Sequence, residues 1–266
     1  MDLKIAISPC PNDTFIFGPI ILGKIDTGIY KFDFTYADID ELNKMSFTGG
    51  FDLIKMSYYH YLSADPDYNA LPCGGAMGYN CGPLFVTSDL QEYLQNDEPL
   101  VGIPGINTTA HFLLNFYKPD IQDKKVIRFD HIEDSIQEKI VDAGVIIHEG
   151  RFTYQQKGLQ LIQDLGEYWH QKTKMPIPLG CIGMHIRYSW HDQEQLTNII
   201  RKSIQYAEAH TDELMPFIKM HAQEMQENVI REHIKLYVNH FTYHIEREGR
   251  LAIEKMGMEI SRQALV

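Results

Sequence analysis

The sequence predicts an α/β fold of two lobes, and three observations support this. Short apolar runs end in polar or Gly- and Pro-rich turns that lead into helical patterns, which is typical of βαβ units and a largely parallel sheet. Two such blocks precede a carboxy-terminal third that is mostly helical. With 266 residues, 44% of them apolar, the chain can bury the core that one large domain or two lobes require.

Four predicted strands run directly into turns that start helical patterns. They cover residues 3–8, 51–57, 100–105 and 143–147. In open parallel sheets, ligands bind at the carboxyl ends of the strands, where the following helices present unpaired N–H groups and the positive ends of their dipoles. These four junctions are therefore the candidate site, and an anionic ligand is favoured there.

Helix signals are strongest in the second half of the chain. Thr153, with Gln156 three residues later, resembles a capping box, and the apolar residues behind it repeat at helical spacing up to Trp169. This pattern predicts a helix over residues 153–169 with one face in the core. From Asp192 onward the sequence predicts mostly helix.

The order of these elements predicts that the chain builds one lobe, crosses to a second and returns. The expected crossing strands are residues 83–88 and 179–185. Residues 1–86 and 184–266 would then form the larger lobe, and residues 87–183 a smaller, inserted lobe. The substrate cleft is expected between them.

The charge balance narrows the class of partner. There are 24 Lys and Arg residues against 36 Asp and Glu, a formal charge of −12. Binding to nucleic acid or to an anionic membrane face needs clustered basic residues, so neither is expected. The partner is expected to be a small molecule. An anion would be received by local N–H groups, with Lys55 and Arg151 as nearby cations, and the acidic excess would lie on the outer faces and spare the cleft.

The amino-terminal residues and the cysteines indicate the compartment. The first residues lack the charged and apolar regions of a secretory signal, and no window approaches the ~20 consecutive apolar residues of a membrane span. The four cysteines are scattered without a CxxC pair, so free thiols in a reducing cytosol are expected. The expected location is the cytoplasm. The sequence allows a homodimer but identifies no surface for one.

His148 is the most informative titratable residue. It follows residues 145–147, an apolar run typical of a buried strand, so it is expected to emerge at the edge of a sheet. A histidine there has a pKa near neutrality and can act as a general base, with Glu149 and Arg151 orienting it or holding a substrate group. The alternative is a structural histidine hydrogen-bonded to a neighbouring loop.

Two further junctions carry small or hydroxylated residues. In residues 105–110 the glycine permits a turn, and either Thr108 or Thr109 can cap the next helix or donate to a carboxylate. From the sequence alone, an ordinary N-cap explains this loop somewhat better. Residues 55–57 form a weaker candidate, because Ser57 can also be a simple cap.

Motifs for nucleotide cofactors and metals are missing from the sequence. There is no G-x-G-x-x-G after a strand, no P-loop and no G-x-S-x-G elbow. His240 and His244 have the spacing of a helical metal pair but lack the glutamate of an HExxH motif, so a solvated helix face is the better interpretation. No cofactor and no metal are therefore expected.

Three ordered motifs are more specific than any single residue. They are SPCPNDTF at residues 8–15, GAMGYNCGPL at 75–84 and VIIHEGRFTY at 145–154. Together they resemble the 1,4-dihydroxy-6-naphthoate synthase family of menaquinone biosynthesis by the futalosine route, and the likeness runs to about Met184. The resemblance implies a two-lobed periplasmic-binding-protein-like fold of the second type, adapted as a cytoplasmic enzyme.

The resemblance also implies an activity and a set of site residues. Members of the family are cofactor-free lyases that convert cyclic dehypoxanthine futalosine to 1,4-dihydroxy-6-naphthoate and release a three-carbon fragment, dihydroxyacetone. The family's catalytic proton acceptor falls on His148. Its substrate-binding positions fall on Lys55, Met56, Ser57, Thr109 and Ala110.

Two other functions remain open. A non-catalytic protein that binds a small anion would share the fold with transport receptors. A chorismate dehydratase of the same pathway would also share it, but is expected to lack the run at residues 148–151. Formation of the naphthoate from the futalosine derivative distinguishes the synthase from both.

Overall fold

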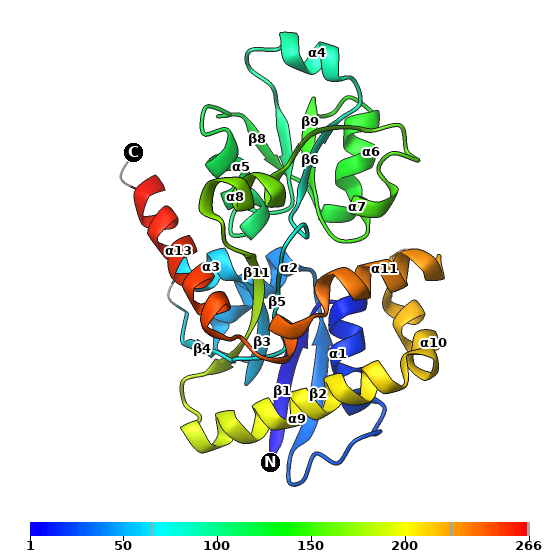
Figure 1. Cartoon of the computed structure of the whole chain (residues 1–266), viewed down its shortest axis with the longest axis vertical. Helices are drawn as coiled ribbons and strands as arrows, with labels where there is room; N and C mark the ends of the chain where they lie inside the picture. The colour runs from blue at the N-terminus through cyan, green and yellow to red at the C-terminus, as the bar shows by residue number, and fades with distance from the viewer. Residues whose placement is uncertain (65, 224–225, 265–266) are drawn as a thin grey trace.

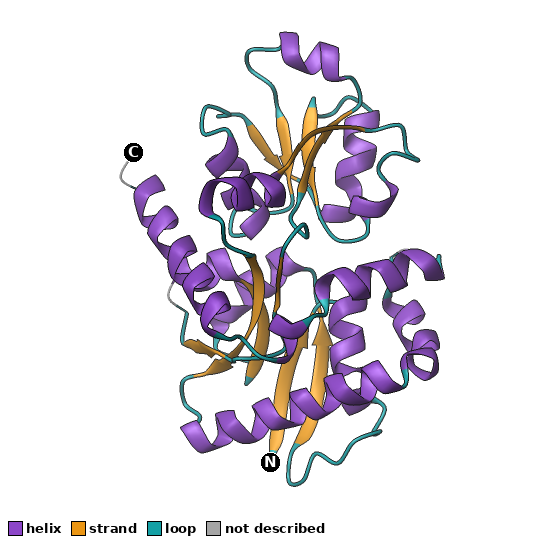
Figure 2. Ribbon diagram, in the orientation of Figure 1, coloured by secondary structure: helices purple, strands orange, loops and turns teal. Residues whose placement is uncertain are grey.

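The computed structural model describes residues 1–64, 66–223 and 226–264. Within these ranges the strands form two mixed sheets, which lie one above the other along the long axis of the molecule (Figure 1). Helices cover the faces of both sheets (Figure 2). None of the described helices is both long enough and apolar enough to cross a membrane.

The first sheet combines amino-terminal strands with one strand from the middle of the chain. Its order is β2-β1-β3-β11-β4, and β5 also pairs with β11. β1 is parallel to β2 and β3, whereas β11 is antiparallel to β3, β4 and β5. The strands are β1 (Asp2–Ile7), β2 (Lys31–Tyr36), β3 (Leu53–Ser57), β4 (Tyr68–Ala70), β5 (Ala76–Gly78) and β11 (Ile177–His185).

The second sheet has the order β10-β6-β9-β7-β8. β7 is parallel to β8 and β9, but β6 is antiparallel to β9 and β10. The prediction of largely parallel sheets is therefore wrong, because β6 and β11 enter their sheets from the crossings between lobes and run against their neighbours. The strands are β6 (Leu84–Thr87), β7 (Val101–Ile103), β8 (Lys124–Val126), β9 (Ala143–Ile146) and β10 (Gln160–Asp164).

Helices pack on both faces of the first sheet. Alternate residues of β1 face opposite sides: Ile5 and Ile7 belong to the apolar cluster under α1 and α9, whereas Ala6 belongs to the cluster on the other face. The helices of this lobe are α1 (Pro11–Ile21), α2 (Ile39–Met45) with a 3₁₀ turn (Ser46–Thr48), α3 (Tyr58–Ala64), α9 (Trp190–Ala209), α10 (Thr211–His221), α11 (Glu227–Tyr237), α12 (His240–Tyr243) and α13 (Arg247–Gln263).

The second sheet is also covered on both faces. Phe112 and Trp169 on α5 and α8 pack together with their ring centroids 6.1 Å apart, and Ile132 and Ile136 on α6 cover the opposite face. The helices of this lobe are α4 (Leu90–Gln95), α5 (Thr109–Tyr117), a 3₁₀ turn (Phe129–His131), α6 (Ile132–Gln137), α7 (Gly150–Thr153) and α8 (Leu165–Thr173).

The chain crosses between the sheets twice, through residues 79–83 and 174–176. The predicted crossing strands lie inside the sheets instead, because β6 pairs in the second sheet and β11 pairs along its whole length in the first. The lobe boundary predicted after residue 86 therefore lies three residues beyond the first crossing segment, and the boundary predicted after residue 183 lies seven residues beyond the second.

The helix predicted over residues 153–169 is wrong. Residues 150–153 form a short helix, residues 160–164 form the edge strand β10, and only residues 165–173 form a helix. Gly158, with φ of +73°, ends the hydrogen-bonded turns that follow the first helix, and the Asp164 side chain accepts hydrogen bonds from two backbone N–H groups at the start of the second helix. The spacing of the apolar residues fits a strand followed by a helix as well as it fits one long helix. Pairing with β6 decides between the two in favour of the strand.

The helical carboxy-terminal third is confirmed. Ser189 and Asp192 form a capping box at the start of α9. The apolar stripe behind it is buried against the first sheet and consists of Leu196, Ile199, Ile200 and Ile204.

Candidate functional site

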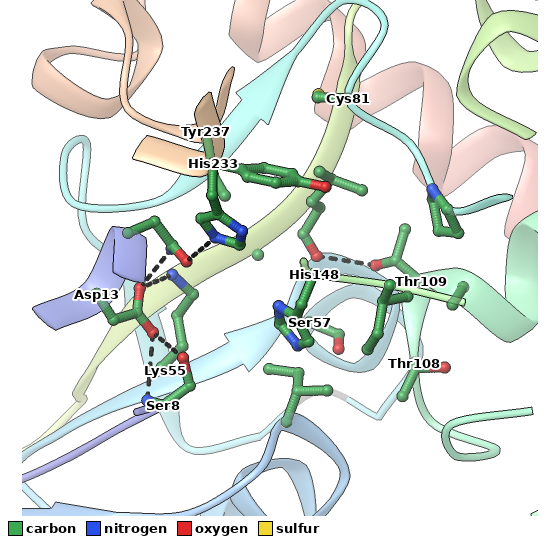
Figure 3. Close-up of a pocket in the computed structure, with 18 residues that line it drawn as sticks. Ser8, Asp13, Lys55, Ser57, Cys81, Thr108, Thr109, His148, His233 and Tyr237 are labelled. Carbon is green, nitrogen blue, oxygen red and sulfur yellow. Dashed lines mark hydrogen bonds and ion pairs between the residues drawn. The ribbon is translucent and has the colours of Figure 1, made fainter. Parts of the chain in front are cut away.

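A cleft opens between the two sheets at the carboxyl ends of their strands. It encloses about 670 Å³, with solvent at its mouth included, which suits a ligand the size of a small metabolite. The residues that line it include Ser8 after β1, Ser57 at the end of β3, Thr109 after β7 and His148 after β9 (Figure 3). The structure thus brings together side chains from the four junctions that the sequence analysis selected.

His148 follows the central strand of the second sheet and lines the cleft. Its backbone adopts a left-handed conformation with φ of +57°, which is uncommon for a residue other than glycine. Its Nδ1 lies 3.3 Å from Sγ of Cys10, and the ring of Phe129 packs edge-on at 4.9 Å. Burial lowers the pKa of His148 to about 4, so the imidazole is neutral at pH 7 and can accept a proton.

Asp13 and Lys55 form a buried ion pair on the opposite wall. Lys55 Nζ donates to Asp13 Oδ1 over 2.6 Å, and the two side chains are 6% and 0% exposed. The Ser8 hydroxyl donates to the other carboxylate oxygen over 2.7 Å. Asp13 is in the first turn of α1, where the helix dipole also favours a negative charge. Lys55 therefore lines the cleft as expected, but its charge already has a counter-charge.

Alternation along β3 separates the three predicted residues at 55–57. Lys55 and Ser57 line the cleft, whereas Met56 is fully buried in the core on the other face of the strand. Asn43 on α2 fixes Ser57, because its Nδ2 donates to Ser57 Oγ over 3.0 Å and also to the carbonyl of Asn107 over 2.9 Å. This side chain connects the two lobes beside the cleft.

The structure of the loop before α5 shows which of its two threonines caps the helix and which lies at the cleft. Thr108 is the N-cap, because its hydroxyl accepts from the backbone N–H of His111 over 3.2 Å. Thr109 and Ala110 line the cleft, and the Thr109 hydroxyl donates to the carbonyl of Leu179 over 3.0 Å. The first N–H groups of α5 therefore lie at the cleft wall, where an anionic group is favoured.

Arg151 does not contribute to the cleft wall. Its Nη1 donates to the carbonyl of Gly82 over 2.6 Å, and its Nη2 pairs with the Asp164 carboxylate. The expectation of a cation near the ligand is therefore wrong for Arg151, which instead ties α7 to the first crossing segment and to the end of β10.

Cys10, His148 and Glu149 bring three potential metal ligands together. One ligand atom from each lies within 4.8 Å of the others. A thiol, an imidazole and a carboxylate are the ligand types that Zn²⁺ accepts, but burial raises the pKa of Cys10 well above its usual value and so favours the protonated thiol. The expectation that the protein uses no metal remains a prediction.

Two cleft residues were missed by the sequence analysis. His233 and Tyr237 are on α11, one helical turn apart, and their rings are 4.5 Å from each other. Burial lowers the pKa of His233 well below its usual value and raises that of Tyr237. Their i, i+4 spacing was visible in the sequence, but nothing in the sequence indicated that this helix face points into the cleft.

The net charge of −12 does not extend into the cleft. Asp13 and Lys55 are the charged residues among those that line it, and they compensate each other. In the part of the chain that the structure describes, the excess of acidic residues therefore lies outside the cleft walls, as expected.

The Tyr58–Tyr59–x–Tyr61 cluster contributes to the core. Tyr58 is fully buried, and Tyr59 stacks on Phe112 at 5.5 Å. None of these rings is among the cleft-lining residues of the described structure.

Comparisons with known proteins agree on one family. The model of a family described as "Menaquinone biosynthesis" matches residues 3–259. The chain is 37% identical over 269 residues to 1,4-dihydroxy-6-naphthoate synthase of Streptomyces coelicolor, covering 99% of this chain and 94% of the relative. It is 36% identical over 263 residues to the synthase of the same name from Thermus thermophilus, covering 99% and 95%.

Solved structures agree on the fold. A protein from Archaeoglobus fulgidus superposes with a TM-score of 0.93 at 28% identity, over 100% of this chain and 98% of that one. The periplasmic aliphatic sulphonate binding protein of Escherichia coli superposes with a TM-score of 0.68 at 10% identity, over 100% and 88%. The second likeness shows the fold alone, and the predicted periplasmic-binding-protein-like fold is confirmed.

Proposed function

Because the chain belongs to the menaquinone biosynthesis family, we propose that it is a 1,4-dihydroxy-6-naphthoate synthase. In this proposal it is a carbon–carbon lyase that converts cyclic dehypoxanthine futalosine to 1,4-dihydroxy-6-naphthoate and dihydroxyacetone. Apart from the similarity to the two relatives, one observation carries the proposal: a neutral histidine at the end of a central strand faces the cleft.

His148 is the proton acceptor in this proposal. A neutral imidazole can remove a proton without first losing one, and the half-buried position of His148 in the cleft wall limits the access of water to the base. Loss of the three-carbon fragment leaves an aromatic ring system, and aromatisation favours the products. The overall conversion is redox-neutral, so the proposal includes no cofactor.

In this proposal the substrate carboxylate binds near the N-terminus of α5. Its first N–H groups, at Thr109 and Ala110, lie at the cleft wall with the positive end of the helix dipole behind them. Ser57 faces the same space, held by Asn43. Lys55 supports this wall through Asp13 rather than as a free cation, and Met56 supports it from the core.

Closure of the lobes around the substrate positions the base. The contacts of Asn43 with Asn107 and of Cys10 with His148 connect the two lobes directly at the cleft. Such closure fixes the distance between a base and the proton that it removes.

A non-catalytic binding protein is the second candidate, because the fold is shared with sulphonate-binding proteins. Incubating the purified protein with cyclic dehypoxanthine futalosine and measuring the naphthoate by chromatography distinguishes the two. The synthase forms naphthoate and dihydroxyacetone in equal amounts. Saturable binding of the substrate without product formation would contradict the proposal.

We place the enzyme in the cytoplasm as part of the same proposal. All four cysteines are buried free thiols, which suits a reducing compartment. A homodimer remains a prediction from the sequence.

A further inference from the structure

The cleft contains a second neutral imidazole, that of His233. The residue is completely buried, yet its ring lines the cleft beside Tyr237 (Figure 3). Its ring is nearly parallel to that of His148, with an interplanar angle of 22° and centroids 6.3 Å apart. A ligand that reaches His148 therefore lies close to His233 as well.

The hydrogen bonds around Asn12 determine which nitrogen of His233 carries the proton. Asn12 Nδ2 donates over 2.8 Å to Asp13 Oδ1, which as a carboxylate oxygen accepts. The amide oxygen of Asn12 therefore faces His233 Nε2, at 3.1 Å, and can only accept. Nε2 must carry the hydrogen, and Nδ1 of the neutral ring is a hydrogen-bond acceptor.

Nδ1 of His233 is buried and has no hydrogen-bond partner among the described residues. A buried acceptor without a donor is unfavourable, and such groups are rare in folded proteins. Two other polar side chains of the cleft have partners: the Asp13 carboxylate accepts from Lys55 and Ser8, and the Thr109 hydroxyl donates to a carbonyl. Because His233 lines the cleft, its Nδ1 is a buried acceptor that a bound ligand can satisfy.

We propose that Nδ1 of His233 accepts a hydrogen bond from a hydroxyl group on the sugar-derived part of the substrate. This inference rests on the proposed function. A carboxylate cannot donate to Nδ1, so the carboxylate of the substrate is directed away from α11 and toward the N-terminus of α5. His233 thus sets which end of the substrate lies on which wall, and it selects for a hydroxylated substrate.

Two substitutions separate this role from a structural one. His233→Gln places an amide N–H near the position of Nε2, which keeps the bond to Asn12 but removes the acceptor. His233→Asn places an oxygen near the position of Nδ1, which keeps the acceptor but removes the bond to Asn12. We expect His233→Gln to lower kcat/KM by about 10- to 100-fold and His233→Asn to lower it several-fold less. A purely structural role predicts the reverse order, and that order would overturn the inference.

A substrate analogue tests the contact itself. With the relevant hydroxyl replaced by hydrogen, the wild-type enzyme should lose about tenfold in kcat/KM, whereas His233→Gln should lose less than about twofold. Equal losses for every deoxy analogue would contradict the inference. If the wild-type protein forms no naphthoate at all, the proposed function fails instead, so the two failures are distinguishable.

A spectroscopic measurement applies if the His233 variants do not fold. In the His148→Ala variant saturated with substrate, the ¹⁵N resonance of His233 Nδ1 should move in the direction that hydrogen bonding to a bare imidazole nitrogen produces. An unchanged resonance at saturation would overturn the inference.

Discussion

Lowering the assay pH from about 7.5 to about 5.5 should leave kcat/KM nearly unchanged. The base must be neutral to accept a proton, so activity is lost as the pH falls through the pKa of His148 in the free enzyme. Burial lowers that pKa to about 4, because the desolvated ring resists taking a charge. The acid limb of the profile should therefore lie near pH 4.

The two possible pKa values give very different activities at pH 5.5. With a pKa of about 4, about 97% of His148 is neutral there, whereas an ordinary pKa of about 6.5 leaves only about 9% neutral. The ratio of kcat/KM at pH 5.5 to that at pH 7.5 should consequently be close to 1, and an ordinary histidine would give about 0.1.

The assay is the initial rate of naphthoate formation at substrate concentrations well below KM, over a range of buffers at constant ionic strength. Enzyme incubated at each pH and returned to pH 7.5 controls for irreversible loss, and circular dichroism controls for unfolding. A half-loss of kcat/KM near pH 6.5 in folded enzyme would refute either the burial of His148 or its role as the base.

Three substitutions test the other parts of the site. His148→Ala should lower turnover by at least about 100-fold while calorimetry shows nearly unchanged substrate affinity, and near-wild-type turnover would exclude this residue as the base. Asp13→Asn leaves Lys55 buried without a counter-charge and should lower the free energy of unfolding in urea by about 3–5 kcal/mol; an unchanged midpoint would contradict the importance of this ion pair. Thr109→Val removes the hydroxyl that donates to Leu179 and should cost about 1 kcal/mol of stability, with Thr109→Ser as the matched control that retains it. Equal urea midpoints for these last two variants would refute the contribution of that hydrogen bond.

The sequence was sufficient to predict the positions of Ser57, Thr109 and His148 in one cleft. Each lies at or after the carboxyl end of a strand, where ligands bind in open α/β sheets. Thr109 and His148 follow neighbouring strands of the second sheet, and Ser57 ends a strand of the first sheet on the other side of the cleft. The roles assigned to these residues are proposals, but their placement follows from local patterns that survive in the fold.

Other features depend on long-range pairing and could not be predicted in this way. Arg151 turns toward Gly82 because the first crossing passes beside it, which no local pattern indicates. The edge strand β10 forms where helical spacing predicted a helix, because β6 offers a free edge. His233 reaches the cleft only because α11 packs against α1. The helical carboxy-terminal part of the sequence contains no motif that would have indicated its role.

The contact between Asn12 and His233 also bears on how the enzyme is made. The two residues are 221 positions apart, so the ribosome has synthesised most of the chain before this contact can form. Both sheets and the proposed base can fold earlier on the growing chain, because domains generally fold as they emerge. The acceptor that positions the substrate is synthesised after all the strands of both sheets, so the enzyme should acquire activity only late in its synthesis. Fragments that end before α11 should be folded in part but inactive.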